Sequence, residues 1–193
     1  MLVACGLACL FGPAAEGADP GVRLVVGVLN YAGVPRETLD LAQAEASTIC
    51  EEAGVSIEWW EPPRSASTDA DRPAIKAASF FVKLLPDSMF PPEPQSSNAW
   101  GCAIGIQAFV FADRIQQASG TTSISFPKTL GHIMAHELGH VLLGKESHAL
   151  GSIMSPTWGE WEFRNMQWGT LRFTPSQANR LVDRIRAQQA ARR

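Results

Sequence analysis

Apolar residues recur along the chain with two periods, and these periods predict alternating strands and helices. Short runs rich in apolar and β-branched residues predict four strands, at 22–30, 55–60, 79–85 and 107–112. Apolar positions at helical spacing predict a helix over 36–53 that ends at Gly54. Because strand, helix and strand follow one another over 22–60, we expect a right-handed crossover and a parallel strand pair there.

Two more helices are predicted in the second half of the chain. One begins near Lys128–Leu130 and ends at Gly144, a residue that readily takes a positive φ. The other begins after Thr174, which forms a capping box with Gln177 and is followed by Pro175 at the first helical position. The buried face of this last helix is expected to consist of Ala178, Leu181, Val182 and Ile185.

Several segments interrupt these patterns and are predicted to be loops. They lie at 61–78, 86–98 and 117–127. Gly101 and Gly105 precede the fourth strand, where they either allow a close backbone approach or mark a bend. The aromatic-rich stretch over 158–173 is expected to form the core of a lower lobe, and the alternative is that it walls a substrate pocket.

The composition is that of one globular domain. The chain has 193 residues, of which 46% are hydrophobic, and its formal net charge is −3. With a pI of about 5.8, neither a nucleic-acid partner nor binding to an anionic membrane surface is expected. The chain contains no run of eighteen apolar residues, so no transmembrane segment is predicted.

The start of the sequence has the pattern of a secretory signal. Residues 1–17 contain a short apolar run followed by a small-x-small triplet at 15–17. We therefore expect a signal peptide over 1–17 and a single exported domain over 18–193, secreted or periplasmic. If the true start lies upstream, Cys5 becomes a candidate for lipid anchoring.

Two cysteines lie outside that signal. In an oxidising compartment, Cys50 and Cys102 would be candidates for a disulfide that closes a long loop. The alternative is a pair of buried thiols that behave as small hydrophobic side chains.

One stretch, 136–148, carries candidate chemistry. His136 and His140 are four residues apart, so on a helix they lie one turn apart on one face and can reach one metal ion. Glu137 follows the first histidine directly, which suits a base for a metal-bound water better than a ligand. After Gly144 the chain offers a third histidine, His148.

This stretch resembles the zincin metallopeptidases and, among them, the metzincins. The metzincin pattern is H-E-x-x-H-x-x-G-x-x-H followed by a Met-turn. Here the glycine falls four residues after the second histidine and the third histidine falls eight after it, and Ser152–Pro156 is a small apolar turn centred on Met154. The whole chain also looks like small secreted bacterial zincin-like proteins of unassigned function.

The resemblance implies a fold and a site. The fold would be α+β and zincin/metzincin-like, with a mixed twisted sheet, an active-site helix, a Met-turn and a C-terminal helix. The strand at 107–112 would be the edge strand over the cleft and would pair with a peptide. His136, His140 and His148 would bind one catalytic Zn²⁺, and Glu137 would be the general base.

Other residues remain open as site components. Glu146, Glu160 and Glu162 are alternatives to His148 as the third ligand, and His132 is an alternative fourth ligand that would close the site. His132 is otherwise expected in the first helical turn, where it orients the site or faces solvent. For the oxyanion, the sequence offers only the weak candidates His132 and Arg164, because its single Tyr lies far away at Tyr31.

Three functions follow from these patterns. The first is an exported zinc metalloendopeptidase that hydrolyses peptide or protein substrates with a zinc-activated water and Glu137 as base. The second is a zinc hydrolase of non-protein amides, such as those of cell walls. The third is a degenerate zincin-fold protein that binds metal or a partner, and the intact Glu137 argues against it.

Overall fold

The computed structural model describes residues 21–61, 79–89 and 99–191. The predicted signal at 1–17, the candidate lipid-anchor residue Cys5 and most of the predicted loops at 61–78 and 86–98 lie outside the described residues. Within the described ranges, no helix is both long enough and apolar enough to cross a bilayer.

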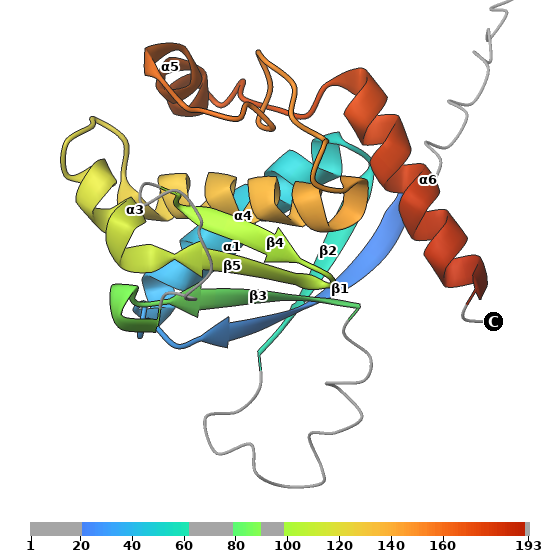
Figure 1. The fold of residues 1–193 in the computed structure, drawn as a ribbon, viewed down its shortest axis with the longest axis horizontal. Coiled ribbons are helices and arrows are strands. Elements are labelled where there is room, and N and C mark those ends of the chain that lie inside the picture. The colour runs from blue at the N-terminus through green and yellow to red at the C-terminus, as the bar shows by residue number, and fades with distance from the viewer. Residues whose placement is uncertain (1–20, 62–78, 90–98, 192–193) are drawn as a thin grey trace, which may run out of the picture.

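A five-stranded mixed sheet forms the centre of the fold (Figure 1). Its strands are β1 (Val22–Asn30), β2 (Val55–Trp60), β3 (Phe80–Leu85), β4 (Gly101–Ile104) and β5 (Gln107–Phe111). In space their order is β2-β1-β3-β5-β4. The pairs β1–β2, β1–β3 and β3–β5 are parallel, and β4 runs antiparallel to β5. The predicted parallel pair and the predicted mixed sheet are both confirmed.

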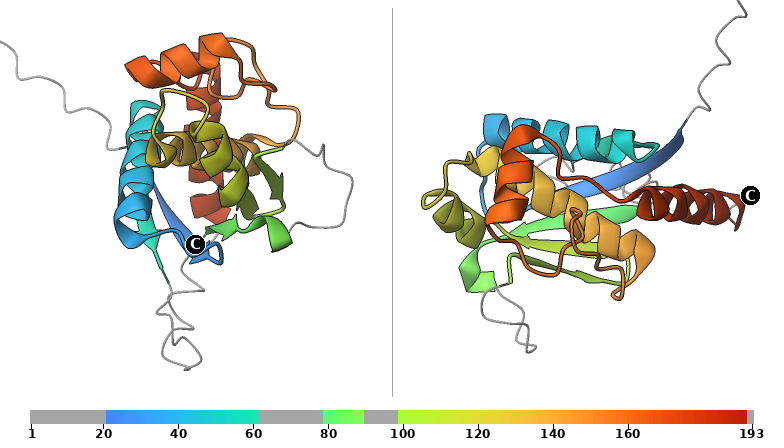
Figure 2. Two further views of the ribbon diagram at one scale, coloured as in Figure 1. Left: turned by 90° about the vertical axis from the view of Figure 1, so that its left-hand side faces the viewer. Right: turned by 90° about the horizontal axis from the view of Figure 1, so that it is seen from above.

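Two long helices cover one face of the sheet. They are α1 (Arg36–Glu52) and α4 (Phe126–Leu143), which lie side by side over the strands (Figures 1 and 2). Between these helices and the sheet lies the apolar core, to which β1 contributes Val26 and Val28, and α4 contributes Leu130 and Met134. Burial of such side chains contributes about 1.5–3 kcal/mol each, so α4 is held rigidly on the sheet.

The last helix, α6 (Pro175–Ala191), packs against α4 and β1. Its predicted capping box is confirmed: Thr174 N donates to Gln177 Oε1 over 2.9 Å, and Gln177 N donates to Thr174 Oγ1 over 3.2 Å. Leu181 and Ile185 are buried as predicted. Near the far end of α6, Gln189 Nε2 donates to the carbonyl oxygen of Arg23 in β1 over 2.8 Å.

The edge strand differs from the prediction. The predicted strand over 107–112 is β5, which lies inside the sheet, and the edge next to α4 is β4. The sequence pattern predicted no strand at β4, only glycines that precede a strand. Gly105, at φ +61, forms the turn that folds β4 back on β5 as a hairpin.

Four helical segments were also missed or misplaced. A helix α3 (Ala112–Ser119) follows β5 without a break, and α4 begins at Phe126 rather than near Lys128–Leu130. The predicted loop at 117–127 included Pro127, but proline fits the first turn of a helix because no N–H is needed there. Two further elements were not predicted, the 3-10 turn η2 (Asp87–Met89) and α5 (Glu160–Trp168).

The aromatic-rich stretch over 158–173 is divided between core and surface. Met166 is fully buried, and Trp158, Phe163 and Phe173 pack against the core. By contrast, Trp161 and Trp168 on α5 are exposed. The expected lower-lobe core is therefore only partly present.

The structure contains no disulfide between Cys50 and Cys102. Cys50 is buried on α1, which packs on β2, and Cys102 lies on β4 at the opposite edge of the sheet. Burial raises the pKa of the Cys50 thiol to about 12. Of the two alternatives for these cysteines, the structure has the unbridged pair, with Cys102 only partly buried, because the width of the sheet separates the two side chains.

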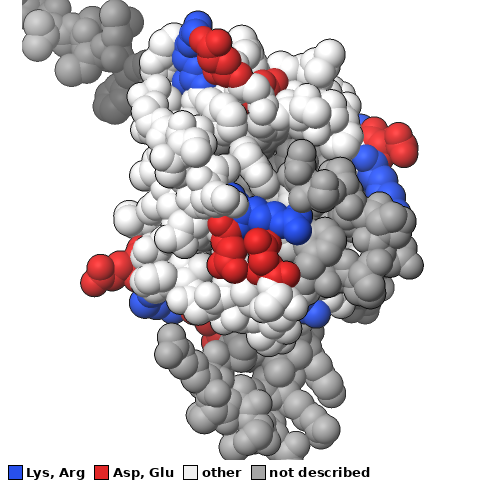
Figure 3. Space-filling model, turned by 60° about the vertical axis from the view of Figure 1, so that its left-hand side comes forward, with Lys and Arg blue, Asp and Glu red and all other residues white. Residues whose placement is uncertain are grey.

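Charged side chains on the described surface are dispersed. Figure 3 shows a face on which Lys and Arg lie beside Asp and Glu in small groups, with mostly uncharged surface between them. The ion pairs of the described residues include that of Arg114 Nε with Asp87 Oδ1, at 2.9 Å. This distribution agrees with a small net charge of −3.

Candidate metal centre

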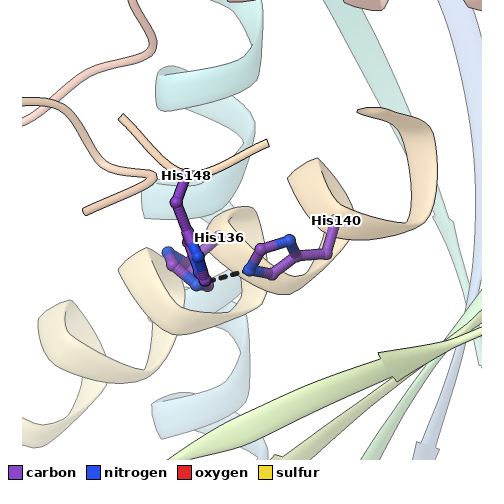
Figure 4. Close-up of side chains that lie close together, drawn as sticks. All are labelled: His136, His140 and His148. Atoms are coloured by element: carbon purple, nitrogen blue, oxygen red, sulfur yellow. Dashed lines mark hydrogen bonds between the residues drawn. The ribbon is translucent and has the colours of Figure 1, made fainter. Parts of the chain in front are cut away.

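Helix α4 and the turn that follows it bring three histidines together. His136 and His140 lie one turn apart near the end of α4, which stops at Leu143 because Gly144 adopts a φ of +93°. The chain then reverses and returns His148 to the same place. One ring nitrogen from each histidine lies within 4.8 Å of the others, and Figure 4 shows the rings converging.

The ring of His136 is fixed by a backbone carbonyl. Its Nδ1 lies 2.7 Å from the carbonyl oxygen of Ile153. A carbonyl oxygen can only accept, so Nδ1 carries the proton and Nε2 presents a lone pair. Burial lowers the pKa of His136 to about 4, so the ring is neutral at neutral pH. It is therefore in the form in which histidine binds metal ions.

The second histidine faces the first at close range. His140 Nε2 lies 3.0 Å from His136 Nε2 (Figure 4). Burial also lowers the pKa of His140. The ring centroids of His140 and His148 are 4.6 Å apart, and His148 is solvent-exposed. The three rings therefore form a cluster that is buried on one side and open to solvent on the other.

Glu137 lies beside this cluster in an apolar environment. Only 4% of its surface is exposed, and among the described residues its Oε2 has no hydrogen-bond partner. Burial raises the pKa of the Glu137 carboxyl to about 8. An unpartnered buried carboxylate is costly, by at least about 1–3 kcal/mol, so its position points to a role other than stability.

Strand β4 presses against Glu137. A Cβ atom placed on Gly101 would lie 2.5 Å from Glu137 Oε1 and 2.7 Å from its Cγ. Only glycine permits this approach of the strand to the carboxylate. Of the two alternatives considered for Gly101, a close backbone approach is present, and it is made to the Glu137 side chain.

A cleft of about 930 Å³ opens over the three histidines. It runs between β4 and the segment that follows α4. Besides the histidines and Glu137, the lining residues include Trp100, Cys102, Ile104, Ile133, Lys145, Pro156 and Trp158. The ring of Trp158 lies edge-on to that of Trp100 at 6.2 Å and to that of His136 at 5.8 Å. The cleft is thus mostly apolar, with the histidines and Glu137 on one wall.

The predicted turn over 152–156 supports the helix from below the cleft wall. Ser152 Oγ donates to the carbonyl oxygen of Ala149 over 2.8 Å and accepts from Met154 N over 3.1 Å. Met154 is fully buried and its sulfur packs directly against Gly139, where no side chain intervenes. The turn therefore contacts α4 at two points. The Ile153 carbonyl oxygen contacts His136, and Met154 packs against Gly139.

The alternative ligands are engaged elsewhere. Glu162 accepts from Gly159 N and from Ser155 Oγ, both over 2.9 Å. Glu160 forms an ion pair with Arg164, and neither residue lines the cleft. Glu146 is exposed and does not line the cleft. Among the described residues, none of these carboxylates joins the histidine cluster.

His132 is buried and does not join the three-histidine cluster. It is fully buried one turn before His136, with Nδ1 3.0 Å from the carbonyl oxygen of Lys128. Its ring lies edge-on to Trp158 at 6.4 Å, and burial lowers its pKa to about 4. The expectation that it faces solvent is wrong, because α1 covers this part of α4. Tyr31 is half exposed and does not line the cleft.

Two side chains near the site were not foreseen. Ser147 is buried, with Oγ 3.1 Å from His140 Nδ1. Gln177 of α6 is also buried and donates from Nε2 to the carbonyl oxygen of Ser147 over 3.0 Å. No motif in the sequence marks Ser147, and Gln177 had been assigned only to the helix cap.

Comparison with known proteins gives likeness to solved structures alone. No protein-family model matches the chain, and no curated protein matches it. The fold is similar to a zinc-dependent peptidase from Methanocorpusculum labreanum (strain Z), with 16% sequence identity and a TM-score of 0.47, over 81% of this chain and 99% of that one. What the site can do is therefore argued from its own side chains.

Proposed function

We propose that this protein is a zinc-dependent metallopeptidase of metzincin-like type. His136, His140 and His148 hold one Zn²⁺, and Glu137 is the general base. The observation that carries the proposal is the convergence of three imidazole nitrogens within 4.8 Å, beside a buried carboxylate and at the wall of an open cleft.

The donor set fits zinc. Imidazole nitrogens are common zinc ligands, and three protein ligands leave a fourth position for water or substrate, as in catalytic zinc sites. His136 presents a lone pair at Nε2 to a neighbouring ring nitrogen 3.0 Å away. A cation at this place would accept the lone pairs of ring nitrogens that otherwise face each other. Because His148 is exposed, the site is open toward the cleft.

When bound, zinc would polarise the scissile carbonyl and lower the pKa of water to about 7. Glu137 would take a proton from the attacking water and pass it to the leaving amine. For this, the carboxylate must be ionised, and its pKa of about 8 reflects burial alone. A dication nearby favours the charged form of a carboxylate, so Glu137 would be ionised beside a bound metal.

The cleft suits an extended peptide. Strand β4 pairs with β5 along one edge, and its other edge lies at the boundary of the sheet, next to α4. A peptide could add to this edge by backbone hydrogen bonds, with its side chains against the Trp100 and Trp158 rings of the cleft. This transfers the expected substrate-pairing strand from 107–112 to β4. Export remains part of the proposal on the basis of residues 1–17.

Glu137 separates a hydrolase from a degenerate binding protein, and the edge of the cleft favours peptides over other amides. A degenerate binding site has no need of a buried carboxylate whose Oε2 lacks a partner. A hydrolase of non-protein amides would need Glu137 equally, so peptide and cell-wall amide substrates must be compared directly. We favour peptides because β4 offers backbone pairing at the edge of the cleft.

The test combines metal content with a change of one atom. Elemental mass spectrometry of the purified protein should find about one zinc per chain. Glu137→Gln should keep that zinc and lower peptide hydrolysis by about 100-fold or more. Glu146→Gln, which changes an exposed carboxylate close in sequence, is the matched control and should leave both unchanged. Hydrolysis that survives in Glu137→Gln, or wild-type protein without zinc, would refute the proposal.

A further inference from the structure

Ser147 makes two hydrogen-bond contacts through a single hydroxyl group. Its Oγ lies 2.6 Å from the carbonyl oxygen of Gly144 and 3.1 Å from His140 Nδ1. A carbonyl oxygen can only accept, and the hydroxyl has one proton, so Ser147 must donate that proton to Gly144. Toward His140, the same oxygen can then only accept. The Gly144 carbonyl oxygen is a second, more distant acceptor for His140 Nδ1, at 3.4 Å.

This arrangement decides which nitrogen of His140 carries its proton. An oxygen that only accepts needs a donor opposite it, so Nδ1 of His140 must be the protonated nitrogen. The neutral ring then presents the lone pair of Nε2. Nε2 is the atom that lies 3.0 Å from His136 Nε2, inside the three-histidine cluster. Ser147 thus does for His140 what the Ile153 carbonyl does for His136.

Ser147 is itself held from a distant part of the chain. Gln177 Nε2 donates to the Ser147 carbonyl oxygen over 3.0 Å, and Gln177 Oε1 accepts from Thr174 N over 2.9 Å. The two partners fix the orientation of the amide, because Thr174 N can only donate and the carbonyl can only accept. Ser147 and Gln177 are both buried, with 3% and 4% of their surfaces exposed.

We propose that Ser147 and Gln177 are positioning residues of the metal centre. Ser147 fixes the His140 ring with Nε2 free for the metal, and Gln177 anchors Ser147 from α6. Because His148 follows Ser147 directly, the same anchor sets the path of the chain into the third ligand. The inference rests on the proposed zinc site. It adds to that site a link of thirty residues in sequence to the last helix.

The first experiment measures zinc affinity by competition with a chromophoric chelator, without reference to catalysis. Ser147→Ala removes the nearer of the two acceptors for His140 Nδ1, leaves only the Gly144 carbonyl oxygen at 3.4 Å, and should weaken zinc binding by about 10-fold or more. Ser147→Thr keeps a hydroxyl and should recover most of that affinity. Thr129→Val is the matched control, because it removes another buried hydroxyl of the same region that contacts the Ser125 carbonyl and no histidine. Equal zinc affinity in Ser147→Ala, Thr129→Val and wild type would overturn the proposal.

The second experiment separates the anchor from the helix cap. Gln177→Glu keeps an acceptor for Thr174 N and replaces the donor to the Ser147 carbonyl with an oxygen, so zinc binding should weaken. Thr174→Ala removes the other half of the capping box and leaves the contact with Ser147 in place. It should lower stability by about 1 kcal/mol and leave zinc affinity unchanged. The reverse pattern, with zinc lost only in Thr174→Ala, would refute the role of Gln177.

The third measurement needs no variant and so does not depend on whether one folds. Two-bond proton–nitrogen correlation spectra of ¹⁵N-labelled, zinc-free wild type, recorded above the ordinary histidine pKa of about 6.5, report the tautomer of each ring. His136 and His140 should both be protonated at Nδ1. A proton on Nε2 of His140 would overturn the proposal. Failure of wild type to bind zinc would instead refute the proposed function, so the two failures are distinguishable.

Discussion

His136 donates from Nδ1 to the carbonyl oxygen of Ile153, over 2.7 Å. This bond joins helix α4 to the turn around Met154, and its two residues are seventeen apart in the chain. A second bond fixes this turn, because Ile153 N donates to the Arg172 carbonyl oxygen over 2.8 Å. The orientation of the first candidate ligand therefore depends on a backbone group whose position is set by the packing of the turn.

Met154 should be important for stability. It is fully buried against Gly139, so Met154→Ala leaves a cavity and should lower the free energy of unfolding by about 2–5 kcal/mol. Met154→Leu keeps the volume and should cost less than about 1.5 kcal/mol. Urea unfolding of the metal-free protein measures both. A loss below about 1 kcal/mol in Met154→Ala, half the smallest loss expected for such a cavity, would mean that this side chain does not hold the turn.

His148 should be required for tight zinc binding. It contributes one of the three converging nitrogens, so His148→Ala removes a third of the protein ligands and should abolish stoichiometric zinc at micromolar protein. Glu162→Gln tests the rival ligand, and it should retain zinc because that carboxylate is bound to Gly159 and Ser155. Elemental mass spectrometry after dialysis checks both. Zinc kept in the first and lost in the second would move the third ligand to Glu162.

Gly101 should affect catalysis more than metal binding. A Cβ at this position would meet Oε1, Cγ and Cδ of Glu137 within 2.8 Å. Those atoms belong to a side chain that can shift, so Gly101→Ala should displace the carboxylate and leave α4 in place. We expect kcat to fall by about 10-fold or more, since a misplaced general base loses much of its contribution, while zinc content stays at the wild-type level.

The control for Gly101→Ala is Gly159→Ala, where a Cβ would meet only ordinary contact at 3.7 Å. Peptidase assays and zinc analysis of the two variants should differ in activity alone. If Gly101→Ala were as active as Gly159→Ala, β4 would not restrain Glu137 in solution.

His132 should make the stability of the metal-free protein depend on pH. Burial lowers its pKa from 6.5 to about 4, so between these values the unfolded chain binds a proton that the folded chain does not. The stabilisation is then complete above pH 6.5 and is lost as the pH falls toward 4. At about 1.36 kcal/mol per pH unit, this group accounts for about 3 kcal/mol.

Urea unfolding in the presence of a chelator, at several pH values within this window, checks the effect of His132. His132→Asn removes the titrating ring, so the fall in stability with decreasing pH should be shallower than in wild type. Parallel curves for the two proteins would show that His132 does not titrate in this range.

Local patterns sufficed for the elements whose contacts are nearby in sequence. The period of the apolar residues predicted β1, α1 and β2, and the caps at Gly144 and Thr174 predicted helix ends, because each depends on a few consecutive residues. The H-E-x-x-H spacing likewise predicted that His136 and His140 would meet, since a helix alone brings them together. His148 required only one reversal of the chain at Gly144.

The features that were missed depend on distant partners. β4 is four residues long and has no alternating pattern, so only its pairing with β5 defines it. The approach of Gly101 to Glu137 and the bond from Gln177 to Ser147 join segments 36 and 30 residues apart. No period or spacing within one segment encodes such contacts. They become visible only when the sheet and the last helix are in place.

The contact of α6 with β1 has a consequence for how the protein is made. β1 is the first strand of the described chain and lies between β2 and β3, while α6, the last helix described, covers its start. Synthesis proceeds from the N-terminus, and non-local pairings of this kind slow folding. Until α6 has left the ribosome, apolar surface of β1 and α4 stays uncovered, so the nascent chain passes through a period of exposure to aggregation that ends only when α6 docks.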